Sequence, residues 1–565
     1  NKTNEQLREI QGTPYTAYWA SDVVLSAFKK SHLVGDVSEP RVGMATANND
    51  RFIRLWFEVN RNKFGINISS RKEAVESRKK WFPFAKGGEQ RKWYGNNDTV
   101  VNWENDGFEI QNFKDEKTGR IRSHNYNLDY IFSSALTWTV IGTEKTSFRF
   151  CPVGFLYSNS GYGLFCNNEK TKYYLLGFMN SKIAASLLKI LSPSMGFESG
   201  YLRKLPLIES DSLDSIVERV KHCIDGSNAE WDSFEISWDF KKHPLLRNVS
   251  TISEAFTQWQ SECDDRFNQL KANEEELNRI FIDIYGLQDE LTPEVEDKDV
   301  TVRKADLQRD IKSLLSYAVG CMFGRYSLDV EGLAYAGGEW DSSKYQSYIP
   351  DADNVIPITD EEYLDDDIVS RLCAWLKAVY GADTLEANLD YIAKALGNKG
   401  STSREIIRNY FLNDFFKDHC QTYSVTGSGK RPIYWLFDSG KQNGFKALVY
   451  LHRYTPDTIG NLRIDYLHKM QRVYESEINR MQDMMDHSEN AREVAAASKR
   501  KDKLAKQLKE CREYDEKISH LALSRIELDL DDGVKVNYRK LQTAQDGKFY
   551  EVLADSKNIM VKEKK

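Results

Sequence analysis

The chain has 565 residues, a length that predicts roughly three or four domains of about 150 residues each. Its residues are 41% hydrophobic and 29% charged, a balance typical of a soluble globular protein. No run of about 18 apolar residues occurs, so we expect neither a membrane-spanning helix nor a membrane partner.

Eight cysteines lie far apart in the sequence, and none forms a Cys-x-x-Cys pair. This spacing favours reduced, mostly buried thiols over a disulfide or zinc framework, and therefore a cytoplasmic protein. The first twenty residues have no basic segment followed by an apolar one, so they do not resemble a signal peptide. The chain starts with Asn rather than Met, and we expect it to begin inside a longer protein.

The net charge of −7 would by itself argue against a protein that binds nucleic acid, but the charge is unevenly distributed. Residues 1–210 carry a net charge of +8, and residues 211–565 carry −15. A basic segment attracts polyanions, while an acidic remainder keeps the protein in solution. Residues 1–210 are therefore the candidate contact region for a polyanion.

The same N-terminal region alternates short apolar and polar runs, a pattern that predicts a mixed α/β domain. Strands are expected at 51–59, 99–110, 136–142 and 163–168. Apolar residues at helical spacing predict a single helix over 171–191.

The stretch KWFPFAKGGEQRKWYGN, residues 80–96, combines five aromatic residues with four Lys or Arg. We expect a β-hairpin that turns at Gly87-Gly88, because glycine adopts the backbone angles that tight turns need. Its aromatic residues would form a rigid core. The polar side chains on either side of the turn would then point outward.

Three further regions are expected after residue 210. They are a helical connector (211–350), a helical domain with a β-hairpin at 431–453 (351–456), and an antiparallel helical hairpin at 457–525 with a C-terminal tail (457–565). Other helices are expected at 250–287, 302–326, 361–380, 384–396 and 402–418, and a strand after 525. The whole pattern predicts the α+β class, with a mixed α/β domain followed by a largely α-helical region.

Motifs of catalysis are missing from the sequence. It has no Walker A loop, no Gly-x-Gly-x-x-Gly, no His-Glu-x-x-His and no Gly-x-Ser-x-Gly. The six carboxylates of 360–371 suit a solvated helix N-terminus better than a metal site, and His419 beside Cys420 suits a core position. We therefore assign no catalytic, cofactor-binding or metal-binding residue.

Two stretches resemble the target recognition domains of adenine-specific DNA methyltransferases from type I and type IIG restriction-modification systems. EPRVGMATANNDRFIRLW (39–56) resembles the opening strand and turn, with Ala47 where glycine is usual. YYLLGFMNSKIAASLLK (173–189) and GYLRKLPL (200–207) resemble the closing helix and strand. The resemblance implies that residues 1–210 are a DNA-binding target recognition domain.

Longer strings, spread over nearly the whole chain, resemble the PglX family of DNA adenine methyltransferases from BREX phage-defence systems. They are GTPYTAYWASD (12–22), KWFPFAKGGEQRKWYGNNDTVVNWENDG (80–107), IPITDEEYLDDDIVSR (356–371), REIIRNYFLNDFFKDHCQTY (404–423) and RPIYWLFDSGKQNGFKALVYLHRY (431–454). The family implies an N-terminal methyltransferase domain, a target recognition domain and a helical C-terminal region. This chain lacks the Asn/Asp-Pro-Pro-Tyr/Phe signature and a Gly-rich S-adenosylmethionine loop. We therefore expect the C-terminal half of such a protein, inactive alone, with S-adenosylmethionine bound only by the full-length protein.

The polar residues of 1–210 then become candidate DNA contacts, since phosphates are met by cations and amides and base edges by Arg, Lys, Asn, Gln, Ser or Thr. The basic run 71–80 is expected on a helix, either at phosphates or as a solvated face. The Asn48–Arg51 stretch is either a structural turn or a DNA contact. The candidate contacts are Arg41, Thr46, Asn48, Asn49, Arg51, Lys79, Lys80, Lys86, Gln90, Arg91, Lys92, Asn96, Ser160, Tyr162, Arg203 and Lys204.

Three hypotheses follow for function. In the first, the chain recognises duplex DNA for an N-terminal methyltransferase domain, its other partner. In the second, it is a non-catalytic specificity or interaction module that docks on other BREX proteins through its helical C-terminal region. A third, an active nuclease-methyltransferase, would need catalytic residues that the sequence does not contain.

Overall fold

The computed structural model describes residues 20–140, 145, 147–192, 197–397, 399–425 and 427–561. The start of the chain, which does not resemble a signal peptide, lies outside these residues. The chain divides into two compact units. The first comprises Asn1–Trp56, Asn62–Trp238 and Gln260–Ala305, and the second comprises Phe57–Arg61, Asp239–Trp259 and Asp306–Lys565. Helices hold 51% of the residues and strands 12%, which confirms the predicted α+β class.

The first unit is built on two four-stranded sheets, with strand orders β2-β9-β6-β7 and β3-β5-β4-β8, and on a two-stranded pair β1-β10. The pairing is parallel between β4 and β8 and antiparallel between the other neighbours. The strands are β1 (His32–Leu33), β2 (Glu39–Arg41), β3 (Ile53–Leu55), β4 (Trp81–Ala85), β5 (Thr99–Asn102), β6 (Ala135–Thr139), β7 (Phe148–Cys151), β8 (Leu156–Tyr157), β9 (Gly161–Phe165) and β10 (Pro206–Leu207).

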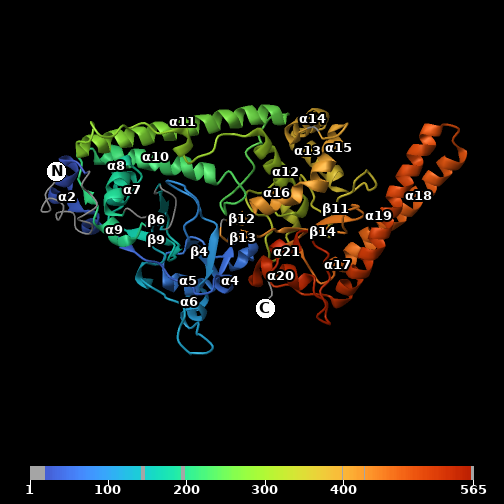
Figure 1. Cartoon of the computed structure of the whole chain (residues 1–565), viewed down its shortest axis with the longest axis horizontal. Helices are drawn as coiled ribbons and strands as arrows, with labels where there is room; N and C mark the ends of the chain where they lie inside the picture. The colour runs from blue at the N-terminus through green and yellow to red at the C-terminus, as the bar shows by residue number, and fades with distance from the viewer. Residues whose placement is uncertain are drawn as a thin grey trace. The chain divides into compact units, whose positions relative to one another are not determined.

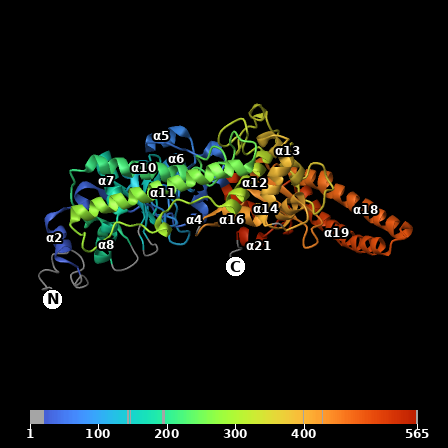
Figure 2. The same cartoon turned by 90° about the horizontal axis from the view of Figure 1, so that it is seen from above.

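Helices cover the sheets of this unit and supply most of its main core. The helices are α2 (Asp22–Lys30), α3 (Val34–Val37), α4 (Asn49–Phe52), α5 (Arg71–Ser77), α6 (Glu104–Gln111), α7 (Glu169–Met179), α8 (Lys182–Leu191), α9 (Ser199–Arg203), α10 (Leu213–Trp231) and α11 (Ile252–Tyr285). Leu136 and Phe148 of the sheet pack with Phe178 of α7 in one apolar cluster. A Cβ at Gly177 would lie 2.8 Å from Val220, so α7 and α10 approach closely. Figures 1 and 2 both show α10 and α11 running side by side.

The segment predicted as one helix over 171–191 is two helices, α7 and α8, bent by 76°. The Ser181 hydroxyl accepts a hydrogen bond from the Ala184 N–H and so starts a new helix at this point. Among the described residues, no single helix is long and apolar enough to cross a membrane, although this bent pair passes the same test by length and composition.

The second unit is largely helical around a three-stranded sheet of order β11-β15-β14. The predicted β-hairpin at 431–453 is confirmed, because β14 and β15 pair in antiparallel register. Its elements are α12 (Leu307–Phe323), β11 (Ile356–Pro357), α13 (Ile368–Tyr380), α14 (Leu385–Leu396), α15 (Ser403–Asn413), α16 (Phe415–Thr422), β12 (Ser424–Val425), β13 (Gly429–Lys430), β14 (Tyr434–Asp438), β15 (Lys446–Tyr450), α17 (Thr458–Asn461), a π-helical turn (Leu462–Leu467), α18 (His468–His487), α19 (Ala491–Ser524), α20 (Gly533–Leu541) and α21 (Ser556–Ile559).

The predicted antiparallel helical hairpin is confirmed as α18 and α19, which Figure 1 shows as a two-helix arm in orange and red. Leu504, Tyr514 and Ile518 are buried on α19, as the helical spacing of apolar residues indicated. The strand expected after residue 525 is wrong. That segment forms helix α20, since Val534, Tyr538 and Leu541 recur at helical spacing and are buried together.

Three fully buried histidines lie in the second unit. Burial lowers the pKa of His243, His419 and His452 to about 3. His419 Nε2 accepts hydrogen bonds from the backbone N–H groups of Ile433 and Tyr434, each at 3.0 Å. The folded protein therefore holds this ring in its neutral form.

We expect acid to destabilise the protein through these three histidines. Burial raises the folded pKa of Asp98 and Asp351 to about 6, so the protons that these two carboxyls bind offset part of the loss. The unfolded histidines take up protons below the ordinary pKa of 6.5, whereas the folded ones stay neutral down to about pH 3. The free energy of unfolding should fall as pH drops through this window, by up to about 1.4 kcal/mol per pH unit for each histidine. Urea unfolding between about pH 7.5 and pH 5.5 measures this loss. His243→Gln should flatten the slope, and the exposed-site control His487→Gln should not; equal slopes for all three proteins would contradict the expectation.

Candidate nucleic-acid interface

The turn between β2 and β3 carries four of the candidate DNA contacts, and in the structure it holds itself together. Asn48 caps α4, because its side-chain oxygen accepts from the Arg51 N–H at 3.1 Å. Thr46 is buried and donates to the Asn49 side chain at 2.6 Å. Ala47 has φ of +59°, a left-handed conformation in which glycine is far less strained. This backbone conformation explains why glycine is usual at this position in the target recognition domains that the segment resembles.

Arg51 is exposed but already engaged. Its Nε donates to Glu109 at 2.8 Å, and its guanidinium lies 5.1 Å from the ring centre of Phe113. Glu109 also accepts from the Asn102 side chain at 2.9 Å. Arg51 therefore connects the turn to α6 rather than projecting freely.

The β-hairpin expected over residues 80–96 is wrong. Trp81–Ala85 forms β4, but β4 pairs with β5 and β8 instead of with residues 89–94. Trp93 makes a single parallel bridge to Arg149 of β7, so the chain after Gly88 leaves one sheet and joins the other. The aromatic residues are core, as expected, because Trp81 and Trp93 are each 1% exposed.

Arg91 and Lys92, which we expected to enter a DNA groove, are instead held inside the first unit. Arg91 is buried, and its Nη2 donates to Glu230 at 2.7 Å and to the Ser227 carbonyl at 2.9 Å. Lys92 Nζ donates to the buried carboxylate of Glu274 at 3.0 Å. Burying a charge costs several kcal/mol unless it is paired, so these two cations stay with their carboxylates.

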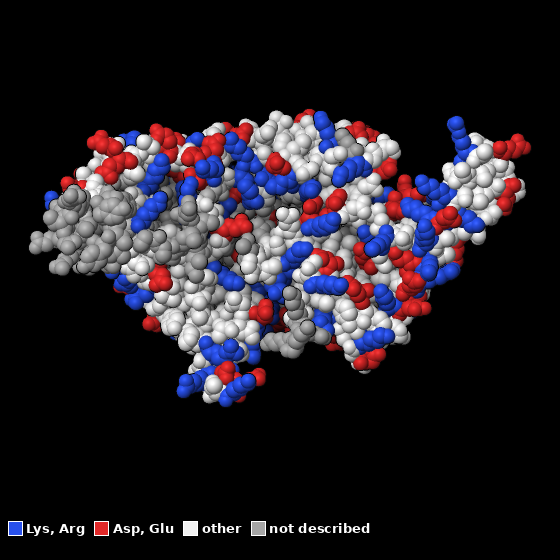
Figure 3. Space-filling view, in the orientation of Figure 1, with Lys and Arg blue, Asp and Glu red and all other residues white. Residues whose placement is uncertain are grey.

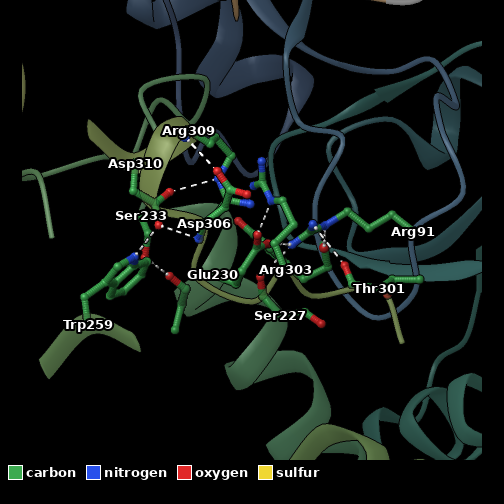
Figure 4. Close-up of polar contacts among 12 residues, drawn as sticks. Arg91, Ser227, Glu230, Ser233, Trp259, Thr301, Arg303, Asp306, Arg309 and Asp310 are labelled. Carbon is green, nitrogen blue, oxygen red and sulfur yellow. Dashed lines mark hydrogen bonds and ion pairs between the residues drawn. The ribbon is translucent and has the colours of Figure 1, made fainter. Parts of the chain in front are cut away.

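Glu230 is the centre of this buried network. Arg303 donates to its second carboxylate oxygen, so two guanidinium groups converge on one carboxylate (Figure 4). Burial by itself raises the pKa of Glu230, but Arg91 and Arg303 outweigh that effect and hold the pKa below its usual range. The carboxylate therefore stays ionised although it is 1% exposed.

The two basic residues of the closing segment lie next to the opening strand. Arg203 of α9 donates to Glu39 at 3.0 Å and to the Pro40 carbonyl at 3.2 Å. Arg41 lies 2.7 Å from the same Glu39 carboxylate, and Lys204 ends α9 half-buried. The structure thus brings Arg41 and Arg203 together, although they are far apart in the sequence.

The polar loop before β9 meets the chain just before the Gly87-Gly88 turn. The Ser160 hydroxyl donates to the Lys86 carbonyl at 2.8 Å, and a Cβ at Gly87 would lie 2.9 Å from the Ser160 carbonyl. Tyr162 lies edge-on to Trp138 with ring centres 5.7 Å apart, and burial raises its pKa.

Near that loop, Gln90 is exposed and Asn96 donates to the Glu89 carbonyl at 2.9 Å. The expected basic helix is α5, after which Lys79 Nζ donates to the Asn62 carbonyl at 2.5 Å and Lys80 lies half-exposed.

A left-handed turn opens α6. Asn105, Asp106 and Gly107 have φ of 51°, 58° and 70°. Arg71 donates twice to the Asp106 carboxylate, at 2.9 and 2.6 Å. A Cβ at Gly107 would lie 2.4 Å from the Trp103 ring, so only glycine fits. This rigid turn sets the direction of α6 and of the exposed segment that follows it.

A basic segment that the sequence analysis did not identify follows α6, at residues 113–122. Its exposed cations are Lys114, Lys117, Arg120 and Arg122. The sequence pattern that could have indicated this segment is the turn Thr118-Gly119 with cations on both sides.

Within the described residues, no group of three or more His, Cys, Asp and Glu side chains is placed to hold a metal ion.

We expect Glu230→Gln to destabilise the protein by about 3–5 kcal/mol, because it leaves the buried Arg91 without its counter-charge. Urea unfolding measures the loss. Glu76→Gln is the matched control, since Glu76 meets Lys72 at 3.8 Å in an exposed pair and should change little. Equal unfolding midpoints for the two variants would show that the Glu230 network is not needed.

We expect Ala47→Gly to stabilise the protein by up to about 1 kcal/mol, because the left-handed backbone costs alanine roughly 1–2 kcal/mol and glycine's extra unfolded freedom cancels part of the gain. The same exchange at the exposed helical Ala387 should instead destabilise it. Thermal unfolding of both variants distinguishes the two signs. A loss of stability at both positions would contradict strain at Ala47.

Comparison with known proteins places the chain next to bacterial methyltransferases. No protein-family model matches it. It is 47% identical over 544 residues to the adenine-specific methyltransferase PglX of Lacticaseibacillus casei (strain Zhang), which covers 94% of this chain and 44% of that protein. It is 35% identical over 590 residues to the adenine-specific methyltransferase BrxX of Escherichia coli O9:H4 (strain HS), which covers 99% of this chain and 46% of that protein. The chain thus spans a little under half the length of both relatives, and along almost its whole length it is related to part of the PglX and BrxX adenine-specific methyltransferases.

Proposed function

We propose that this chain is the target recognition and C-terminal part of a site-specific adenine (N6) DNA methyltransferase of a BREX phage-defence system. The observation that carries the proposal is the 47% identity to a PglX methyltransferase along 94% of the chain. In this proposal, residues 1–210 bind duplex DNA. Methyl transfer from S-adenosylmethionine then occurs on an N-terminal methyltransferase domain outside this chain, and the chain alone is inactive.

The charge distribution supports DNA binding by residues 1–210. Their net charge of +8 contrasts with −15 on the rest of the chain. A methyltransferase must extrude its adenine from the duplex at a cost of a few kcal/mol, which phosphate and base-edge contacts elsewhere offset. A basic region held to helices α10 and α11 by the buried Arg91–Glu230 and Lys92–Glu274 pairs suits this task.

The structure narrows the proposed contacts. Thr46, Arg91 and Lys92 are engaged inside the unit, and Asn48 is a helix cap. The other proposed contacts all have an exposed or half-exposed side chain: Arg41, Asn49, Arg51, Lys79, Lys80, Lys86, Gln90, Asn96, Ser160, Tyr162, Arg203 and Lys204.

We expect the purified chain to bind duplex DNA with an affinity that weakens as salt is added. The logarithm of the binding constant should fall linearly with the logarithm of salt concentration, with a slope of about −0.9 for each phosphate neutralised. Fluorescence anisotropy of a labelled duplex between about 50 and 200 mM KCl measures this slope. No methyl transfer to the same duplex is expected from S-adenosylmethionine.

The absence of binding to any duplex, or an affinity that does not change with salt, would refute the proposal. Methyl transfer by this chain alone would refute the assignment of catalysis to another domain. Adding the separately expressed N-terminal part of the relative PglX provides the positive control for catalysis.

A second candidate function is docking on other BREX proteins, and the helical arm favours it. Beyond the buried pair Met481 and Ala497, the ends of α18 and α19 expose most of their side chains. Nearer its base the arm is held by Arg500 and Lys503, which pair with Glu361 and Asp360. Capture of a BREX protein by the chain without DNA, and its loss when 482–496 is shortened, would support docking.

A further inference from the structure

The segment that follows α6 forms a short antiparallel hairpin at residues 113–122. Lys114 and Ile121 lie opposite each other, and the Asp115 N–H donates to the Arg120 carbonyl at 2.8 Å. Figure 1 shows this segment as a loop that extends beyond α6, away from the sheets of the first unit.

The end of the hairpin is a closed turn that faces open space. The Asp115 carboxylate accepts from the N–H groups of Lys117 and Thr118 at 3.1 and 2.9 Å. Gly119 has φ of +67° and donates to the Asp115 carbonyl at 2.8 Å. A Cβ at Gly119 would meet nothing within 4 Å. The turn is therefore ordered by its own hydrogen bonds and not by packing.

The base of the hairpin is anchored to the core. The Phe113 ring lies edge-on to Phe52, with the ring centres 5.2 Å apart. The Arg51 guanidinium lies 5.1 Å from the centre of the same Phe113 ring. Ser123 is buried and donates to the Ile110 carbonyl at 2.5 Å. A firm base and a free end make the hairpin a rigid projection.

The projecting part is rich in cations. Lys114, Lys117, Arg120 and Arg122 outnumber Asp115 and Glu116, which leaves a net charge of +2 over ten residues. Of these four cations, only Arg122 forms an ion pair among the described residues, with its Nε 3.9 Å from an Asp115 carboxylate oxygen. Figure 3 shows the resulting group of Lys and Arg side chains at the end of this projection. Unpaired cations on a projection attract a polyanion at little desolvation cost.

The two faces of the hairpin differ. Because side chains alternate along paired strands, Lys114 and Ile121 share one face, while Arg120 and Arg122 share the other. Ile121 is 52% exposed, although it is apolar. A two-stranded ribbon fits the major groove of B-DNA, where arginine pairs with guanine and an apolar side chain contacts the thymine methyl group. One face thus offers an aliphatic side chain with a lysine, and the other face offers two arginines, the side-chain types that this chemistry uses.

We propose that the 113–122 hairpin enters the major groove of duplex DNA, with Lys117 and Arg120 at its free end contacting phosphates and base edges. The inference rests on the proposed DNA-binding function and assigns to it a contact element that none of the other proposed DNA contacts belongs to. Ile121 is then the apolar contact, and the left-handed turn before α6 holds the hairpin in its direction.

The test compares two double variants of the full chain. Lys117→Gln with Arg120→Gln removes two cations from the hairpin, and Lys499→Gln with Lys506→Gln removes two exposed cations from α19. The hairpin variant should bind duplex DNA at least about fivefold more weakly. Its salt slope should be smaller in magnitude by up to about 1.8, at about 0.9 per phosphate contact. The α19 variant should bind as the unaltered chain does.

Equal affinity of the hairpin variant and the unaltered chain would overturn the inference and leave the proposed function in place. No duplex binding by the unaltered chain would overturn both. Urea unfolding of each variant checks that the exposed substitutions leave the fold intact. Charge reversal, Lys117→Glu with Arg120→Glu, should deepen the loss, and unchanged binding after reversal would also overturn the inference.

Discussion

One buried carboxylate holds together the part of the molecule that we propose to meet DNA. Glu230 accepts from Arg91, 139 residues earlier in the chain, and from Arg303, 73 residues later. Neither Glu230 nor Arg91, both buried, could be left alone in the interior, because the cost of desolvating an unpaired ion exceeds what most single contacts supply. The segment after β4 that carries Arg91 is therefore joined through Glu230 to helix α10 and to the loop that carries Arg303. The basic N-terminal region thus exposes many lysines at its surface while buried ion pairs hold its interior in one arrangement.

The same constraint sorts the basic residues into two kinds. Arg91 and Lys92 are structural because each meets a buried carboxylate, whereas Lys117 and Arg120 are exposed on either side of Gly119, where an added Cβ would meet none of the described residues within 4 Å. Charge alone does not distinguish the two kinds. A cation that already has a desolvated partner gains little from a phosphate, while an exposed one loses only water.

The relation to PglX and BrxX methyltransferases and the structure address different questions. The relation covers almost the whole chain but less than half of each relative. The structure has a first unit that contains the basic N-terminal region, and a second, largely helical unit with a two-helix arm. The proposed recognition and the proposed docking are compatible, because the candidate DNA contacts and the helical arm belong to different units.

Local pattern in the sequence was sufficient for the α+β class, for the long helix α11, for the β14–β15 hairpin and for the helical arm. Each depends on periodic apolar residues and on turn or cap residues within one segment. Tertiary contacts decided the rest. The stretch 80–96 has the local pattern of a hairpin, yet β4 pairs with β5 and β8. Arg91 turns inward to the buried carboxylate of Glu230 on α10, which lies far along the chain. Which residues carry charge follows from the order of the amino acids alone. Which of those charges are paired depends on the folded chain, because the partners come from segments far apart in the sequence.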